Sequence, residues 1–169
     1  MTTALAKCGF TYDTLLRRKS DGGLISAASA RNRVPTEGLN AIAEAFFRAG
    51  GVPSALHIGL WTGAHVPDGT ETAATLLSVV TEVTAYTSDT RVELVLGDPA
   101  NGGLDNTASV AEFTGNATST INGAFVVTSS GKGATSGLLI AAEKFDSPET
   151  LKSAGILKLT SGFMFANPA

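Results

Sequence analysis

Cysteine is almost absent from this sequence of 169 residues, in which Cys8 is the only one. A single cysteine excludes a disulfide within the chain and a zinc site built on several cysteines. Charged residues are also scarce, at 16% of the chain against about a quarter in an average globular domain. So little charge argues against long helices that face water. It predicts a surface of Thr, Ser, Asn and Ala, or one covered by neighbouring subunits.

The sequence also lacks long apolar runs. None approaches the roughly 20 residues that a helix needs to cross a membrane. Residues 1–10 contain no apolar stretch of the kind that a signal peptide carries. We therefore expect the chain to be made in a reducing cytoplasm and to have no membrane partner.

Residues suited to catalysis or metal binding are few and scattered. The two histidines, His57 and His65, have no G-x-S-x-G nucleophile motif to serve, and His65 with Asp68 offers only two weak metal ligands. Residues 130–133 read Ser-Gly-Lys-Gly, but a phosphate-binding loop needs Ser or Thr after the lysine and a glycine where Val126 stands. We expect no catalytic residue, no metal ligand and no cofactor, and we do not expect an enzyme.

Glycine is abundant, at 19 residues, and it separates short segments of high β propensity. These segments cover residues 55–62, 79–84, 91–96, 108–114, 119–129, 138–145 and 156–165. Asn101-Gly102 predicts a tight hairpin, Asn122-Gly123 predicts a bulge within a strand, and residues 131–137 predict a turn. Seven or eight short strands joined by such turns are typical of a β-sandwich or barrel.

One helix is expected before these strands, over residues 37–49. Thr36 is a typical N-cap after Pro35, and Gly50-Gly51 is a typical stop. The apolar face of this helix consists of Leu39, Ile42, Ala43, Phe46 and Phe47. We expect that face to pack on the core of the protein.

The first 35 residues differ from the rest in charge and in pattern. They hold six basic and two acidic residues, a net charge of +4, whereas residues 36–169 carry −7. They show little periodicity and too few apolar residues to fold alone. We interpret residues 1–35 as an extended basic arm in front of a β domain at residues 36–169. Such an arm is a solvated tail, lies on an acidic protein surface, or, with the least support from its composition, binds nucleic acid.

Several short sequence motifs in a fixed order give the chain a family resemblance. The motifs are Thr36-Glu37-Gly38-Leu39-Asn40, Leu56-His57-Ile58-Gly59-Leu60, Glu82-Val83-Thr84-Ala85-Tyr86 with Thr90-Arg91, Asn106-Thr107-Ala108-Ser109, and Ile121-Asn122-Gly123-Ala124-Phe125-Val126-Val127-Thr128-Ser129-Ser130 with Lys132-Gly133. In these motifs, residues 36–165 resemble the capsid decoration, or cement, proteins of tailed bacteriophages. The basic segment in front of residue 36 is additional to that resemblance.

The resemblance implies a jelly-roll-like β-sandwich of about eight strands, assembled as a homotrimer on the outer surface of a phage head. Its partner would be the major capsid protein, whose neighbouring copies it would hold together without direct contact with nucleic acid. We expect the arm to contact the capsid or an adjacent copy. Its contact residues would be Arg17, Arg18, Lys19, Arg31 and Arg33. Deleting residues 1–35 should then leave a folded body.

Two other functions remain open at this stage. A receptor- or carbohydrate-binding jelly-roll module is one, although one Trp and two Tyr are few for a sugar site. A component that completes the tail or the head of the virion is the other, and its oligomer would have a different symmetry.

Overall fold

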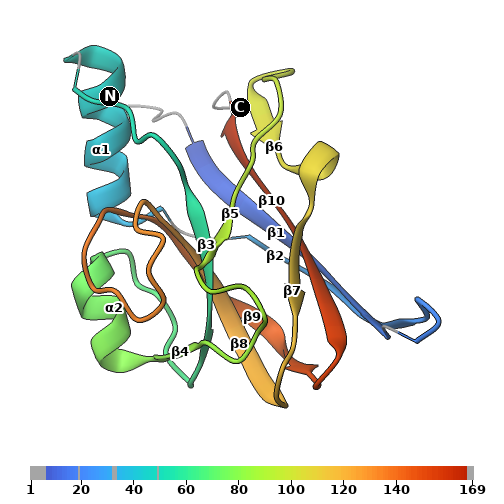
Figure 1. The fold of residues 1–169 in the computed structure, drawn as a ribbon. Coiled ribbons are helices and arrows are strands. Elements are labelled where there is room, and N and C mark those ends of the chain that lie inside the picture. The colour runs from blue at the N-terminus through green and yellow to red at the C-terminus, as the bar shows by residue number, and fades with distance from the viewer. Residues whose placement is uncertain (1–6, 19, 32–33, 49, 167–169) are drawn as a thin grey trace.

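The structure is a computed structural model that describes residues 7–18, 20–31, 34–48 and 50–166. Within these residues the chain forms ten β-strands, two α-helices and one short 3-10 helix (Figure 1). In chain order they are β1 (Lys7–Arg18), β2 (Leu24–Arg31), α1 (Thr36–Phe47), β3 (His57–Thr62), α2 (Ala73–Val79), β4 (Thr81–Val83), β5 (Val92–Glu93), β6 (Gly103–Asp105), η1 (Thr107–Ser109), β7 (Ala111–Thr114), β8 (Ser119–Val127), β9 (Leu139–Leu151) and β10 (Gly155–Ala166).

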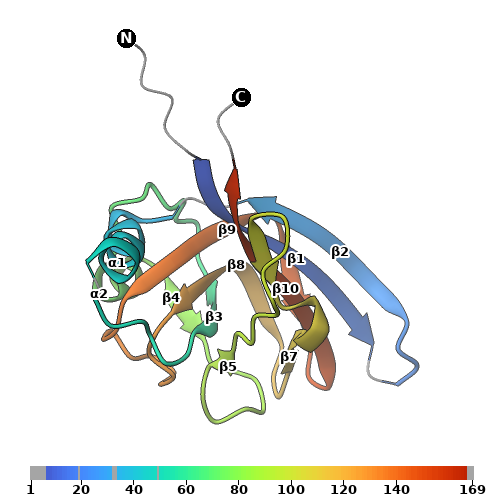
Figure 2. The same ribbon diagram turned by 90° about the horizontal axis from the view of Figure 1, so that it is seen from above.

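The strands form two antiparallel sheets that pack face to face (Figures 1 and 2). The first sheet has the order β2-β1-β10-β6, and β7 also pairs with β10. The second sheet has the order β4-β3-β8-β9, and β5 also pairs with β3. The all-β sandwich predicted from the sequence is therefore confirmed, with ten strands in the described residues rather than about eight.

The main core lies between the two sheets. Leu60 of β3, Val126 of β8 and Leu157 of β10 are completely buried there. A smaller cluster, in which α2 packs against Trp61 and Phe125, lies on the other face of the second sheet. The second sheet is thus buried on both faces, which explains why β3 shows four consecutive buried residues instead of an alternating pattern.

The prediction of an arm separate from the body is wrong for the described part of residues 1–35. β1 lies between β2 and β10, and it pairs with β10 along its whole length. The register runs from Lys7 opposite Ala166 to Arg18 opposite Gly155. No domain boundary therefore separates this segment from the rest of the sandwich.

The physical reason lies in the side chains that these two strands turn inward. Tyr12 and Leu16 of β1 are buried in the main core. β2 contributes small inward residues, among them Ala30, which let it lie close to β9. The segment cannot fold alone, but the partner that orders it is the C-terminal strand of the same chain.

α1 forms close to its predicted position, over Thr36–Phe47, but its docking side differs from the prediction. Leu39 is 43% exposed and Ala43 is exposed, while the side chains of Phe46 and Phe47 lie outside the described part of the structure. The apolar stripe expected to face the core is therefore turned partly toward solvent.

Gly38 and Ile42 make the contact of α1 with the body instead. A Cβ atom on Gly38 would lie only 2.7 Å from the carbonyl oxygen of Ile140 in β9. Glycine at this position lets the first turn of the helix approach the strand backbone closely. Ile42, half-buried, then packs against the main core.

Two of the predicted local features are confirmed. Asn101 and Gly102 have φ angles of 50° and 78°, and the backbones of Ala100 and Gly103 exchange hydrogen bonds of 2.8 and 2.9 Å across them, as in a tight hairpin. The register of β8 against β9 shifts between Ile121 and Gly123, at the predicted bulge.

α2 is an element that the β propensity of its surroundings concealed. It begins after Thr72, which accepts a hydrogen bond from the backbone N–H of Thr75 while the Thr75 side chain accepts one from Thr72. This reciprocal capping explains how a helix of seven residues forms in a segment rich in Thr and Val.

Candidate functional site

The structure places two of the five predicted contact residues in a described environment. Arg17 and Arg18 end β1, at the turn into β2. Arg31 ends β2, with its side chain outside the described part of the structure, and Lys19 and Arg33 lie outside the described residues. The basic residues that can be located thus belong to a β-hairpin instead of a loose arm.

This hairpin, whose described residues are 17–18 and 20–25, lies at the margin of the molecule (Figures 1 and 2). Its turn is closed by two backbone hydrogen bonds, from Arg18 to Gly23 and from Gly22 to Arg18, at 2.9 and 2.8 Å. The Arg18 guanidinium lies 2.7 Å from Asp21, and both side chains are more than half exposed. Arg17 donates to the carbonyl oxygen of Gly22 at 3.0 Å.

Another arginine, Arg91, is completely buried. Its guanidinium makes two hydrogen bonds of 2.8 Å to the carboxylate of Glu82, which is itself 4% exposed. It also donates to the carbonyl oxygens of Ser129 and Ala134, at 3.0 and 2.9 Å, and lies 5.0 Å from the centre of the Phe125 ring. Arg91 therefore fixes the loop between β8 and β9 to the body.

Lys132 holds the same loop from its other side. Its ammonium donates to the carbonyl oxygens of Thr84 and Tyr86, at 3.1 and 3.0 Å, and lies 3.7 Å from the centre of the Tyr86 ring. Burial lowers the pKa of Lys132, while the negative charges of Asp89 and Glu82 act in the opposite direction. Lys132 therefore joins two loops of the sandwich.

These contacts bring together short sequence motifs that lie far apart in the chain. Residues 82–86, 90–91 and 129–134 form one hydrogen-bonded unit in which the backbone N–H of Gly133 also donates to Glu82, at 2.7 Å. Several of the motifs that carry the family resemblance therefore lie in one structural unit, whose hydrogen bonds position the loops of the sandwich.

His65 and Asp68 belong to a loop organised by Glu71. The buried Glu71 carboxylate accepts hydrogen bonds of 2.9 Å from the backbone N–H groups of Asp68 and Gly69, and it lies 2.8 Å from Nε2 of His65. Burial acts to raise the pKa of Glu71, but these hydrogen bonds outweigh it, so the pKa lies below its usual value. The loop is thus built around a carboxylate that the sequence did not single out.

Asn106 replaces a piece of missing strand. Its side-chain oxygen accepts a hydrogen bond of 2.7 Å from the backbone of Ser161, and its side-chain amide donates to Leu159 at 3.2 Å. It lies between β6 and β7, which pair with different parts of β10. Its complete burial is therefore structural, because it satisfies the backbone of β10 where strand pairing is interrupted.

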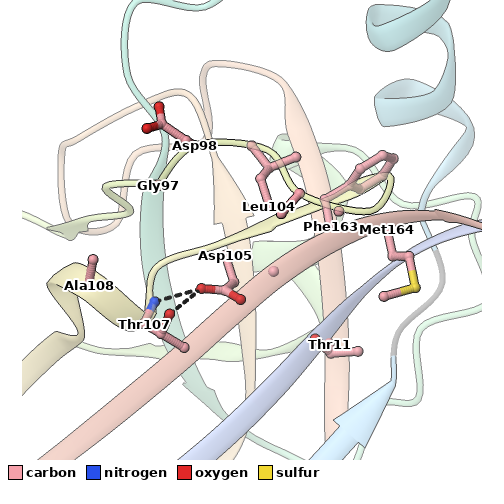
Figure 3. A pocket seen from close by; sticks show the side chains of 12 residues that line it. Thr11, Gly97, Asp98, Leu104, Asp105, Thr107, Ala108, Phe163 and Met164 are labelled. Carbon is pink, nitrogen blue, oxygen red and sulfur yellow. Dashed lines mark hydrogen bonds between the residues drawn. The ribbon is translucent and has the colours of Figure 1, made fainter.

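A hollow of about 400 Å³ lies at the end of the first sheet opposite to the hairpin. Figure 3 shows the carboxylates of Asp98 and Asp105 at this hollow, together with the apolar side chains of Leu104, Phe163 and Met164. Asp105 accepts hydrogen bonds from the backbone and hydroxyl of Thr107, which lower the pKa of its carboxyl group. Both aspartates are exposed, so the hollow is a shallow surface feature.

Other kinds of site find no support in the described residues. No group of three or more His, Cys, Asp or Glu side chains among them is arranged to hold a metal ion. Within the same residues, neither helix has the length and apolar character needed to cross a membrane. Comparison with known proteins finds no family model and no curated protein that matches the chain.

Sequence reasoning missed the hollow and the exposed apolar side chains of the hairpin. The hollow combines residues from the β5–β6 loop, η1 and β10, whose proximity follows only from strand pairing. Leu24 and Ile25 were available as a signal, since two bulky apolar residues follow Gly22-Gly23 directly. That signal predicts a strand after a turn, but it does not predict that both side chains stay exposed.

Proposed function

We propose that this protein is a capsid decoration protein of a tailed bacteriophage. It binds the outer surface of the head as a homotrimer and stabilises the contacts between neighbouring major capsid proteins. The resemblance of residues 36–165 supports this proposal. The hydrogen-bonded unit of residues 82–86, 90–91 and 129–134 also supports it, because several of the motifs that carry the resemblance meet there.

The observation that carries the proposal is the segregation of charge over an otherwise poorly charged sandwich. Residues 7–31 hold five basic and two acidic residues, whereas residues 32–169 hold seven basic and 13 acidic residues. Two of the basic residues, Arg17 and Arg18, lie on a marginal hairpin beside the exposed side chains of Leu24 and Ile25. Exposed apolar side chains beside a cluster of positive charge are typical of a surface that contacts another protein of opposite charge.

A decoration protein needs no deep pocket. It contributes many modest contacts, and the symmetry of the head repeats each of them, so that the summed affinity exceeds that of any single contact. The rigid sandwich fits this role because its loops are fixed by buried bonds such as that of Arg91 with Glu82.

The test is co-sedimentation of the purified protein with phage heads that lack it. We expect the protein to pellet with expanded heads to a saturating ratio, and to pellet much less with unexpanded heads. Raising the salt concentration should weaken binding, because contacts between exposed charges are screened. Absence of binding to expanded heads, or equal binding to both forms and to an unrelated particle, would contradict the proposal.

A further inference from the structure

The hairpin formed by residues 17–18 and 20–25 presents a basic and apolar knob to solvent. Leu24 and Ile25 are 55% and 50% exposed, far more than large apolar side chains in the core. The ion pair of Arg18 with Asp21 is open to water, so it is weak and can exchange for a better partner. The knob therefore combines two guanidinium groups with two apolar side chains.

The hollow at the opposite end of the sheet presents the complementary chemistry. Asp98 and Asp105 supply two exposed carboxylates, and one oxygen of Asp105 is already held by Thr107. Leu104, half-buried, and Met164, 55% exposed, supply an apolar floor and wall (Figure 3). Carboxylates beside apolar surface are a suitable receptor for arginines beside apolar side chains.

The knob and the hollow cannot meet within one chain. β1 and β10 pair over twelve residues, with Met164 opposite Gly9 at one end and Gly155 opposite Arg18 at the other. At about 3.3 Å per residue, the two surfaces are separated by roughly 20–30 Å along the sheet. Each molecule thus carries the knob at one end of the first sheet and the hollow at the other.

We propose that the hairpin of one copy docks into the hollow of a second copy of this chain. The contact is head to tail, so the same pair of surfaces repeats from copy to copy and closes into a ring when the rotation between copies allows it. The inference rests on the proposed function in one respect, since a closed ring of three is the trimer of that proposal. The charge complementarity does not depend on the capsid.

Analytical ultracentrifugation of the protein alone tests this contact. The wild-type chain should form a discrete assembly at low salt that dissociates as salt is added, because the contact is partly electrostatic. The double variant Arg17→Glu/Arg18→Glu should weaken assembly at least about tenfold, and so should Asp98→Arg. Arg48→Glu, which reverses an exposed charge at the C-terminal end of α1, is the control and should assemble as the wild type does.

Charge reversal on both surfaces distinguishes a direct contact from general repulsion. A chain that carries Arg17→Glu, Arg18→Glu, Asp98→Arg and Asp105→Arg together places two positive charges in the hollow against the negative knob, and it should recover assembly. A wild-type chain that stays monomeric at about 100 μM, a double variant that assembles normally, or a combined variant that stays dissociated would each overturn the inference.

The two proposals fail separately in these experiments. A chain that is monomeric alone but pellets with expanded heads retains the decoration function and excludes the head-to-tail contact. A chain that assembles through knob and hollow but does not bind heads retains the contact and excludes the decoration function.

Discussion

Arg91 is the residue whose environment the sequence concealed most completely. Its guanidinium is fully buried and makes four hydrogen bonds, two of them to Glu82. A buried ion pair contributes little beyond what a well-packed apolar pair would, but removing one partner leaves a charge uncompensated in the interior. The pair is therefore a point of high sensitivity.

Arg91→Ala should lower the free energy of unfolding by about 3–5 kcal/mol, because Glu82 would remain buried without its partner. Urea denaturation followed by circular dichroism measures this change. Arg48→Ala, which breaks the exposed pair of Arg48 with Glu44, is the control and should cost less than about 1 kcal/mol. Equal effects of the two substitutions would contradict the burial of Arg91.

Glu71 makes the stability depend on pH. Its pKa is lowered in the folded protein from a usual value of 4.5, so the unfolded chain takes up a proton at higher pH than the folded one. The stabilisation is fully present above about pH 5 and is lost as the pH falls through the lowered pKa.

Denaturation curves between pH 6 and about pH 3 test this dependence. Glu71→Gln should be less stable than the wild type at neutral pH, and its stability should fall less steeply below the usual pKa of 4.5. Glu44→Gln removes an exposed carboxylate from α1 and should keep the wild-type slope. A Glu71→Gln variant with an unchanged slope would show that the carboxylate does not stabilise the loop.

At the scale of elements, β1 is the strand on which the first sheet depends. It separates β2 from β10 and supplies Tyr12 and Leu16 to the core. A chain without residues 1–35 would expose the edge of β10 and the apolar residues that β1 covers. Its unfolding, and not a folded body, is now the expected result of that deletion.

A matched pair of leucines tests the position of β1 without deleting it. Leu16 is 3% exposed and Leu15 is 36% exposed, because neighbouring residues of a strand face opposite sides. Leu16→Ala should cost about 2–5 kcal/mol of stability in thermal or chemical denaturation. Leu15→Ala should cost less than about 1 kcal/mol. Equal and small effects would restore the interpretation of this segment as an arm.

Local signals in the sequence were sufficient for most of the elements. The helix α1, the hairpin at Asn101-Gly102 and the bulge at Asn122-Gly123 depend on residues close together in the chain, and each is found near its predicted place. α2 was missed because its Thr and Val residues favour strands, and only the reciprocal capping of Thr72 and Thr75 reveals it.

The features that the sequence did not reveal depend on distant partners. β1 and β2 looked irregular because small and polar residues such as Thr14 and Ala28 occupy inward positions, and their apolar cover comes from β9 and β10. The hollow likewise exists only after β6 and β10 pair. Pairing over such separations has no local signature in a single sequence.

At the scale of the whole molecule, charge and shape give the sandwich a direction. The basic hairpin lies at one end of the first sheet and the acidic hollow lies at the other end along the strands. The two ends of each molecule therefore differ in charge. Assembly should therefore respond more strongly to salt than the stability of a single chain does, because the core is insulated from solvent and the ends are not.

The pairing of β1 with β10 also determines when this protein can finish folding. β1 leaves the ribosome early, but the strand beside which it belongs is made more than a hundred residues later, on the order of ten seconds at typical rates of synthesis. The second sheet, residues 57–151, can be complete before then. Until β10 emerges, the apolar face of β1 lacks the strand that covers it, and pairing across so large a separation in sequence is expected to slow folding.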